Sequence, residues 1–292
     1  MRYYAYYPGC AMESEGVPIE RSLMAVAKIL DIQLKELDDW TCCGCPGAPI
    51  HELYAVSFAA RNLALAEKTG LDLVAPCSCC YRNLKNAHLT VVEDRRVGPK
   101  VNEALAAVGL HYGGGVRVRN MIDVLINDFG LEAIAAKVKV PLNGLAVACW
   151  YGCHETRPYG PDDPELPTWL DQIVEVLGAR PVNFPLKAQC CGGAQLISQP
   201  DVALKLVWKL LDNAADNGAV AMVTTLCPLC HSNVDATQMR VNRRFKTKFQ
   251  MPVLASTQLI GLAFGLTPKE VGLDKNIVPW EKVLSPYLKV RA

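Results

Sequence analysis

The cysteines of this 292-residue chain form two series with the same order of motifs, one in each half of the sequence. In each half, a lone cysteine after a glycine is followed by a Cys-Cys-Gly triplet and then by a Cys-x-x-Cys hook. Matching positions lie 143 to 150 residues apart, and a repeat of this length indicates a duplicated domain rather than a solenoid unit. The paired positions are Cys10 and Cys153, Cys42 and Cys190, Cys43 and Cys191, Cys77 and Cys227, and Cys80 and Cys230.

Short apolar segments lead into the lone cysteine and into the hook of each half, at residues 3–7, 71–76, 145–149 and 220–225. Such segments are typical of buried parallel strands. Helical periodicity covers residues 18–30, 52–69 and 201–217, and the last two helices stop at Gly70 and Gly218, where a left-handed cap is expected. Strands that alternate with helices predict an α/β fold. We expect two pseudo-symmetric, Rossmann-like parallel-sheet domains that arose by internal duplication.

The boundary between the domains is expected between Gly130 and Leu145, where residues 138–144 are typical of a linker or turn. This predicts a first cluster domain at residues 1–140 and a second at residues 141–292, the latter with a C-terminal extension. In both domains the lone cysteine and the hook follow the carboxyl ends of strands. Open α/β sheets place their ligands at that edge.

Each half offers five thiols from separate loops, which is the donor set that an iron–sulfur cluster needs. Gathering thiolates of like charge is unfavourable unless a multivalent soft metal centre binds them. Zinc in one half is the alternative, although zinc sites usually pair two Cys-x-x-Cys hooks. Cys45 and Cys79 are interpreted as neighbouring thiols that do not bind the metal, and Cys149 as a buried thiol inside a strand. The ten paired cysteines are therefore the candidate metal and cofactor ligands.

The cysteine count, the net charge and the length of the apolar runs argue against several classes of protein. The odd count of 13 cysteines, the chain length and the absence of a basic-then-apolar leader argue against a disulfide framework and for a cytoplasmic protein. A net charge of +1 gives no reason to expect nucleic acid as a partner. No uncharged apolar run approaches about 18 residues, so we expect no membrane insertion.

At the cysteine motifs the sequence resembles the CCG-domain family, and most closely the B subunit of heterodisulfide reductase. The resemblance covers residues 3–266 and includes the histidines that follow two of the cysteines, His154 and His231. It implies one noncubane [4Fe–4S] cluster in each half, held by five thiolates, with the two clusters facing one another. It also implies that a disulfide is reduced between them, which in methanogens is the coenzyme M–coenzyme B heterodisulfide. The partners implied are two further polypeptides of the complex, the flavin-containing A subunit plus the ferredoxin-like C subunit.

Two further expectations concern the reaction. His154 and His231 are candidate catalytic residues, because a histidine near cluster sulfur can protonate a leaving thiolate, and the alternative is that they merely cap strand ends. Cys45 and Cys79 depart from the family pattern, so the native disulfide can differ from that of methanogens. The alternative functions are an electron-transfer subunit of a lactate, glycolate or succinate oxidoreductase and a zinc-stapled scaffold.

Overall fold

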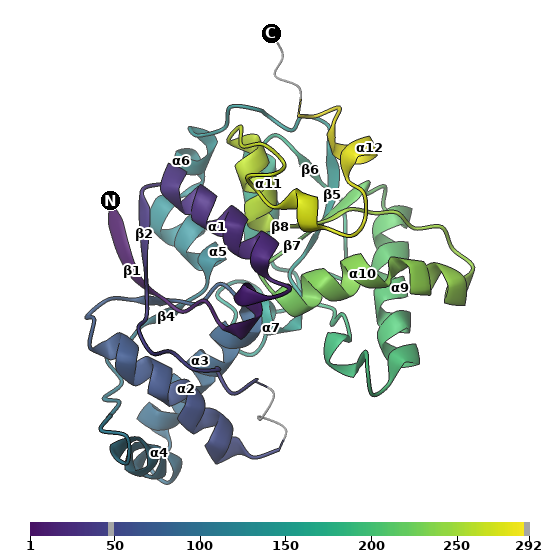
Figure 1. The fold of residues 1–292 in the computed structure, drawn as a ribbon. Coiled ribbons are helices and arrows are strands. Elements are labelled where there is room, and N and C mark those ends of the chain that lie inside the picture. Colours follow the sequence, from purple (N-terminus) through teal and green to yellow (C-terminus); the bar gives the residue numbers. More distant parts are fainter. Residues whose placement is uncertain (46–49, 289–292) are drawn as a thin grey trace.

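The computed structural model describes residues 1–45 and 50–288 as two parallel sheets with helices packed around them (Figure 1). Each sheet has four strands, and every neighbouring pair is parallel. This confirms the predicted α/β class. The first sheet contains β1 (Arg2–Tyr6), β2 (Ile32–Glu36), β3 (Leu73–Val74) and β4 (Val118–Arg119). The second contains β5 (Ala146–Trp150), β6 (Arg180–Pro181), β7 (Ala221–Thr224) and β8 (Val253–Ala255).

The two sheets share one topology. Their strand orders are β2-β1-β3-β4 and β6-β5-β7-β8, so each strand of the first sheet has an equivalent in the second. The central strands β1, β3, β5 and β7 are those predicted from the apolar segments. Their equivalence supports the origin of the chain by duplication. The proposed boundary at residue 140 lies between β4 and β5 and stays a prediction.

Helices connect the strands of each sheet. The α-helices of the first half are α1 (Val17–Ile29), α2 (Glu52–Glu67), α3 (Ser78–Glu93), α4 (Val97–Ala106), α5 (Met121–Asp123) and α6 (Leu131–Ala135), with a π-helical turn at Val124–Phe129. Those of the second are α7 (Cys153–Thr156), α8 (Trp169–Val176), α9 (Pro200–Asp216), α10 (Pro228–Phe245), α11 (Ser256–Ala263) and α12 (Glu281–Leu284). Short 3₁₀ turns are η1 (Cys10–Glu13), η4 (Gly193–Gln195) and η5 (Leu273–Lys275). Gly70 and Gly218 adopt the positive φ expected where α2 and α9 end.

The halves pack on one another through equivalent elements. Helix α1 of the first half lies against α11 of the second, and α8 of the second lies against α6 of the first (Figure 1). Leu23 and Val26 on α1 share one buried apolar core with Leu259 on α11. Inside this contact the Ser22 and Thr257 hydroxyls form a buried hydrogen bond of 2.7 Å. Burial of this apolar surface fixes the two sheets relative to one another.

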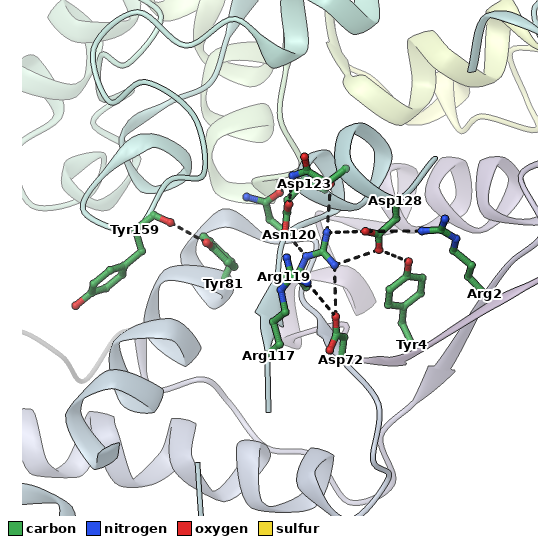
Figure 2. A network of polar contacts seen from close by, with 11 residues as sticks. Arg2, Tyr4, Asp72, Tyr81, Arg117, Arg119, Asn120, Asp123, Asp128 and Tyr159 are labelled. Carbon is green, nitrogen blue, oxygen red and sulfur yellow. Dashed lines mark hydrogen bonds and ion pairs between the residues drawn. The ribbon is translucent and has the colours of Figure 1, made fainter. Parts of the chain in front are cut away.

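A buried arginine fixes the edge of the first sheet (Figure 2). The Arg119 side chain, at the end of β4, is only 2% exposed and pairs with Asp123, with Asp128 at 3.1 Å and with Asp72 at 3.4 Å. Although burial opposes ionisation of Asp128, hydrogen bonds from Arg119 and Tyr4 hold its pKa below the ordinary value. A buried cation needs such partners, because its desolvation is otherwise unfavourable. The network therefore ties β4 to β3 and to the π-helical turn.

Along the described residues, none of the helices combines the length and the apolarity that crossing a bilayer requires.

Candidate metal centres

The predicted ligand cysteines lie at the carboxyl ends of the central strands. In the first half, β1 leads to η1, which begins at Cys10, and β3 leads to Cys77 at the N-terminus of α3. In the second half, β5 leads to α7, which begins at Cys153, and β7 leads to Cys227 at the N-terminus of α10. Each hook therefore spans the first turn of a helix, and the Cys-Cys-Gly loop of the same half completes the group. The topology brings together all ten cysteines that the sequence predicted as ligands.

In each half the five thiols follow one another in a chain in which each affects the pKa of the next, and the order is the same in both halves. In the second half, the Sγ atoms of Cys191 and Cys230 lie 3.5 Å apart. The first chain runs Cys10, Cys42, Cys43, Cys80, Cys77. The second runs Cys153, Cys190, Cys191, Cys230, Cys227. We call these the first and second thiol groups.

The two thiol groups approach one another through the first cysteines of their hooks. Cys77 and Cys227 are both buried, and each affects the pKa of the other although 150 residues separate them. Beside them, the Ser78 and Thr225 hydroxyls lie 3.3 Å apart. The surrounding contacts are also equivalent, since α3 packs on α7 and α10 packs on η1. Electron donors and acceptors bound in the two groups would therefore be close neighbours.

Backbone N–H groups donate to the cysteine sulfurs. Gly192 N lies 3.3 Å from Cys190 Sγ, and Gly193 N lies 3.2 Å from Cys191 Sγ. Gly192 reaches this geometry with φ of +76°, and its equivalent Gly44 has φ of +78°. A positive φ is readily adopted only by glycine. The Cys-Cys-Gly motif thus supplies two sulfurs together with the turn that directs backbone donors at them.

Hydrogen bonding also favours thiolates within each group. Hydrogen bonds from Cys42 and Cys80 lower the pKa of Cys43 to about 4. Hydrogen bonds from Cys153 and Cys191 lower the pKa of Cys190 to about 2. A thiolate is the form of cysteine that binds metal. Hydrogen bonds from Cys227 and Cys80 also lower the pKa of Cys77, so the thiolate form is favoured at two sulfurs of the first group and at one of the second.

The three remaining cysteines lie outside the two groups. Cys149 is fully buried in β5, where burial raises the pKa of its thiol, in agreement with its interpretation as a core residue. Cys45 and Cys79 form a disulfide bond, which corrects their interpretation as spare thiols. The physical reason is proximity, because one follows the Cys-Cys-Gly turn and the other lies inside the hook that faces this turn.

The two predicted histidines differ in position. His154, on α7, is half-buried, and its pKa is lowered by burial and by the nearby positive charge of Arg82. The charges of Cys190 in the second group and of Cys77 and Cys43 in the first oppose this shift, so His154 is near enough to both groups to be affected by their charge. His231, on α10, is 3% exposed, and its Nε2 lies 3.0 Å from the Val253 carbonyl of β8. That contact gives His231 a structural partner, and its catalytic role stays a prediction.

Two asparagines support the Cys-Cys-Gly loops and were missed from the sequence. Asn233 Nδ2 donates to the Cys191 carbonyl at 2.9 Å, and Asn83 Nδ2 donates to the Cys43 carbonyl at 3.4 Å. Each asparagine stands three residues after the second cysteine of its hook. The extended pattern Cys-x-x-Cys-x-x-Asn, present in both halves, was the signal that could have identified them. Glu155, buried beside the hook residue Ser78, was also missed, and burial raises its pKa to about 7.

The proline-rich loop at residues 157–167 bridges the halves. Tyr81 on α3 donates a hydrogen bond to the Tyr159 carbonyl at 2.7 Å (Figure 2). The Tyr159 hydroxyl in turn donates to Asn86 Oδ1 at 2.7 Å. The loop is therefore anchored to the first half at Tyr159, while residues 163–166 are exposed.

The donor set of each group fits an iron–sulfur cluster. It consists of five soft sulfurs from three separate segments, with backbone donors directed at them, and both properties are typical of cluster sites. Across residues 1–45 and 50–288, no group of three or more His, Cys, Asp or Glu side chains is arranged closely enough to hold a metal ion.

Comparisons with known proteins agree with this site. The family model of the CCG cysteine-rich domain matches residues 4–85 and 147–235, the two segments that carry the thiol groups. The chain belongs to this cysteine-rich domain family.

Three relatives align along almost their whole length. A heterodisulfide reductase B-subunit-like protein from Archaeoglobus profundus is 33% identical, covering 98% of both chains. The B subunit of a ferredoxin:CoB-CoM heterodisulfide reductase from Methanosarcina mazei is 30% identical, covering 100% of this chain and 99% of that protein. The membrane anchor subunit of an 8-methylmenaquinol:fumarate reductase from Wolinella succinogenes is 35% identical, covering 96% of this chain and 98% of that protein.

A solved structure supports the fold. The crystal structure of a hypothetical protein from Helicobacter pylori matches with a TM-score of 0.73 at 16% identity. The match covers 94% of this chain but 52% of that one, so the chain spans about half its length. The B subunits of heterodisulfide reductases are thus sequence relatives, and this structure is a relative in fold alone.

A matched pair of glycines tests whether the sulfur positions matter for metal binding. A Cβ at Gly9 would lie 2.9 Å from Cys80 Sγ, whereas a Cβ at Gly152 would lie 3.7 Å from Cys230 Sγ. Both glycines have a positive φ, so alanine strains the backbone by about 1–2 kcal/mol at either position. Only Gly9→Ala also displaces a ligand sulfur. We expect Gly9→Ala to lose roughly half of the bound iron and Gly152→Ala to retain most of it, as measured after anaerobic purification. Equal iron content in the two variants would contradict this account.

Proposed function

We propose that this chain is the disulfide-reducing subunit of a heterodisulfide reductase-like complex, with one noncubane [4Fe–4S] cluster in each thiol group. The observation that carries the proposal is the pair of equivalent five-sulfur chains that meet at Cys77 and Cys227. The family membership and the relatives among heterodisulfide reductase B subunits support it. A disulfide has two sulfurs to reduce, and two adjacent groups provide one site for each.

The residues of the chain would have distinct roles. The ten cysteines hold the clusters, and the N–H groups of Gly192 and Gly193 stabilise the charge on sulfur by hydrogen bonding. When bound, each cluster supplies one electron and an iron site for one substrate sulfur. Asn83 and Asn233 fix the loop of each group through its backbone carbonyl. His154, whose pKa responds to the charge of both groups, would deliver a proton to a departing thiolate.

The proposed partners follow from the heterodisulfide reductase relatives. The flavin-containing A subunit together with the ferredoxin-like C subunit would deliver the electrons, and the complex would act in the cytoplasm. The experiment that tests the proposal measures disulfide reduction by the assembled complex. The anaerobically purified chain is combined with its partner subunits and a reduced electron donor. It is expected to release two thiols from a disulfide in a panel that includes the coenzyme M–coenzyme B heterodisulfide. Cluster-loaded complex that consumes no disulfide from the panel would contradict the proposal.

A histidine variant tests the proton role. His154→Asn keeps a side chain of similar size but cannot act as an acid at neutral pH, so turnover should fall about 10²-fold while the iron content stays unchanged. His231→Asn is the matched comparison, because His231 also follows a hook cysteine but its ring contacts the Val253 carbonyl. We expect it to alter stability more than the rate per iron-loaded protein. Full turnover in His154→Asn would refute the proton role.

A second candidate function is electron transfer without disulfide chemistry. The observation that favours it is the 35% identity to a subunit of 8-methylmenaquinol:fumarate reductase. In this alternative the chain would pass electrons between a quinol and a flavin-containing partner of the succinate, lactate or glycolate oxidoreductase type. Quinol-dependent reduction of the bound clusters, without thiol release from any disulfide, would identify this function.

A further inference from the structure

A disulfide bond lies beside the first thiol group and has no equivalent beside the second. Cys45 and Cys79 are bonded, with Cα atoms 6.7 Å apart, in the usual range for a disulfide. Cys45 comes two residues after Cys43, and Cys79 comes directly before Cys80. Neither sulfur belongs to the chain of five that forms the first group.

The duplicated fold explains why these positions are adjacent. Their equivalents in the second half are Gly193, two residues after Cys191, and Leu229, directly before Cys230. A Cβ at Gly193 would lie 2.9 Å from Leu229 Cγ, so the same two positions also touch in the second half. The fold therefore juxtaposes them in both halves, and only the first half fills both with cysteine.

The disulfide joins the two segments that donate backbone hydrogen bonds to the first group. The backbone N–H groups of Cys45 and Cys79 help to lower the pKa of Cys43 and of Cys77, respectively. In the second half the matching donor is Gly193 N, at 3.2 Å from Cys191 Sγ. Opening the disulfide would release the covalent link between two loops that position ligand sulfurs.

Both sulfurs belong to half-buried residues, whereas Cys149 is fully buried. We propose that Cys45 and Cys79 form a redox-active pair that exchanges with dithiol and disulfide compounds at a site separate from the ten ligand sulfurs. A thiolate of the dithiol attacks one sulfur of the pair, forms a mixed disulfide and releases the other cysteine. The second thiol of the reagent then closes on the first, so the dithiol is oxidised and the Cys45–Cys79 bond is reduced to two thiols. This inference does not rest on the proposed function.

The experiment uses the full, iron-loaded chain under anaerobic conditions. It is equilibrated in dithiothreitol buffers of increasing reducing strength, treated with a maleimide and mapped by peptide mass spectrometry. We expect labels to appear together at Cys45 and Cys79 as the buffer becomes more reducing, while the iron content stays constant. Failure to label either cysteine in the most reducing buffer, or labelling only as iron is lost, would overturn the proposal.

Variants separate the pair from the other cysteines. In Cys45→Ser, Cys79 is expected to be labelled in every buffer, and Cys79→Ser should have the same effect on Cys45. Cys149→Ser is the control and should show the same transition as the unaltered chain. Iron loss in both single variants would show that these sulfurs are ligands and would also overturn the proposal. Because the readout is thiol labelling, absence of disulfide turnover by the complex leaves the result intact.

Discussion

Cys191→Ala is expected to remove about half of the iron and to abolish disulfide turnover. Cys191 is the central sulfur of the second chain, with Cys190 on one side and Cys230 at 3.5 Å on the other. Its loss divides the donor set, and the remaining sulfurs no longer enclose one inorganic core. Cys43→Ala should have the same effect on the first group, because it occupies the same position in that chain. Iron analysis and turnover of the anaerobically purified variants provide the measurement.

The control for these variants is Cys149→Ala. Cys149 is also a buried cysteine, but it lies in β5, outside the two thiol groups. Its replacement should leave the iron content and the turnover per iron unchanged, with only a modest loss of stability from the lost packing. If Cys43→Ala and Cys191→Ala retained as much iron as Cys149→Ala, the ligand assignment would be wrong.

Arg119→Met is expected to lower the free energy of unfolding by about 3–5 kcal/mol, because it leaves buried carboxylates without their cation. The Asp123 and Asp128 side chains are only 11% and 19% exposed, and both pair with Arg119. For a chain of this size the melting temperature should fall by roughly 10 °C. Anaerobic denaturant and thermal unfolding measure the change.

A surface ion pair provides the comparison. The Arg244 and Asp201 side chains are 60% and 79% exposed, so Arg244→Met should change stability by less than about 1 kcal/mol.

The pH dependence of the unfolding free energy provides a second check. The pKa of Asp128 is lowered from 3.8, so its contribution to stability is present above that pH and is lost as the pH falls further. Arg119→Met should weaken this acid-dependent loss, and equal stability of both arginine variants would contradict the account.

The central strands and the grouping of the ten cysteines could be predicted because each leaves a strong local signal, and the role of these cysteines as ligands stays a prediction. A buried parallel strand is a short apolar run, and α2 ends where Gly70 supplies a positive φ. The cysteine spacing recurs in both halves, and the structure brings the ten sulfurs together as predicted. The duplication made these signals easier to recognise, because a motif that recurs in both halves is not a chance occurrence.

What the sequence did not predict depends on contacts between distant segments. Strands β4 and β6 have two residues each, like β3, but each contains an arginine and lacks the apolar run that marks β3. The Arg119 network joins residues 72, 123 and 128, whose proximity only the folded sheet defines. The Cys45–Cys79 bond likewise depends on the approach of a turn to a hook 34 residues away. His231 carried the same local pattern as His154, and only the structure shows that it contacts β8.

The central claim is that the ten sulfurs form two groups of five, each holding a polynuclear iron–sulfur core. The most direct test is a count of iron, acid-labile sulfide and zinc in the anaerobically purified chain, with a Mössbauer spectrum of the same sample. The account predicts about eight iron and about eight sulfide atoms per chain and negligible zinc. Zinc at about one atom per thiol group, with little sulfide, would contradict it.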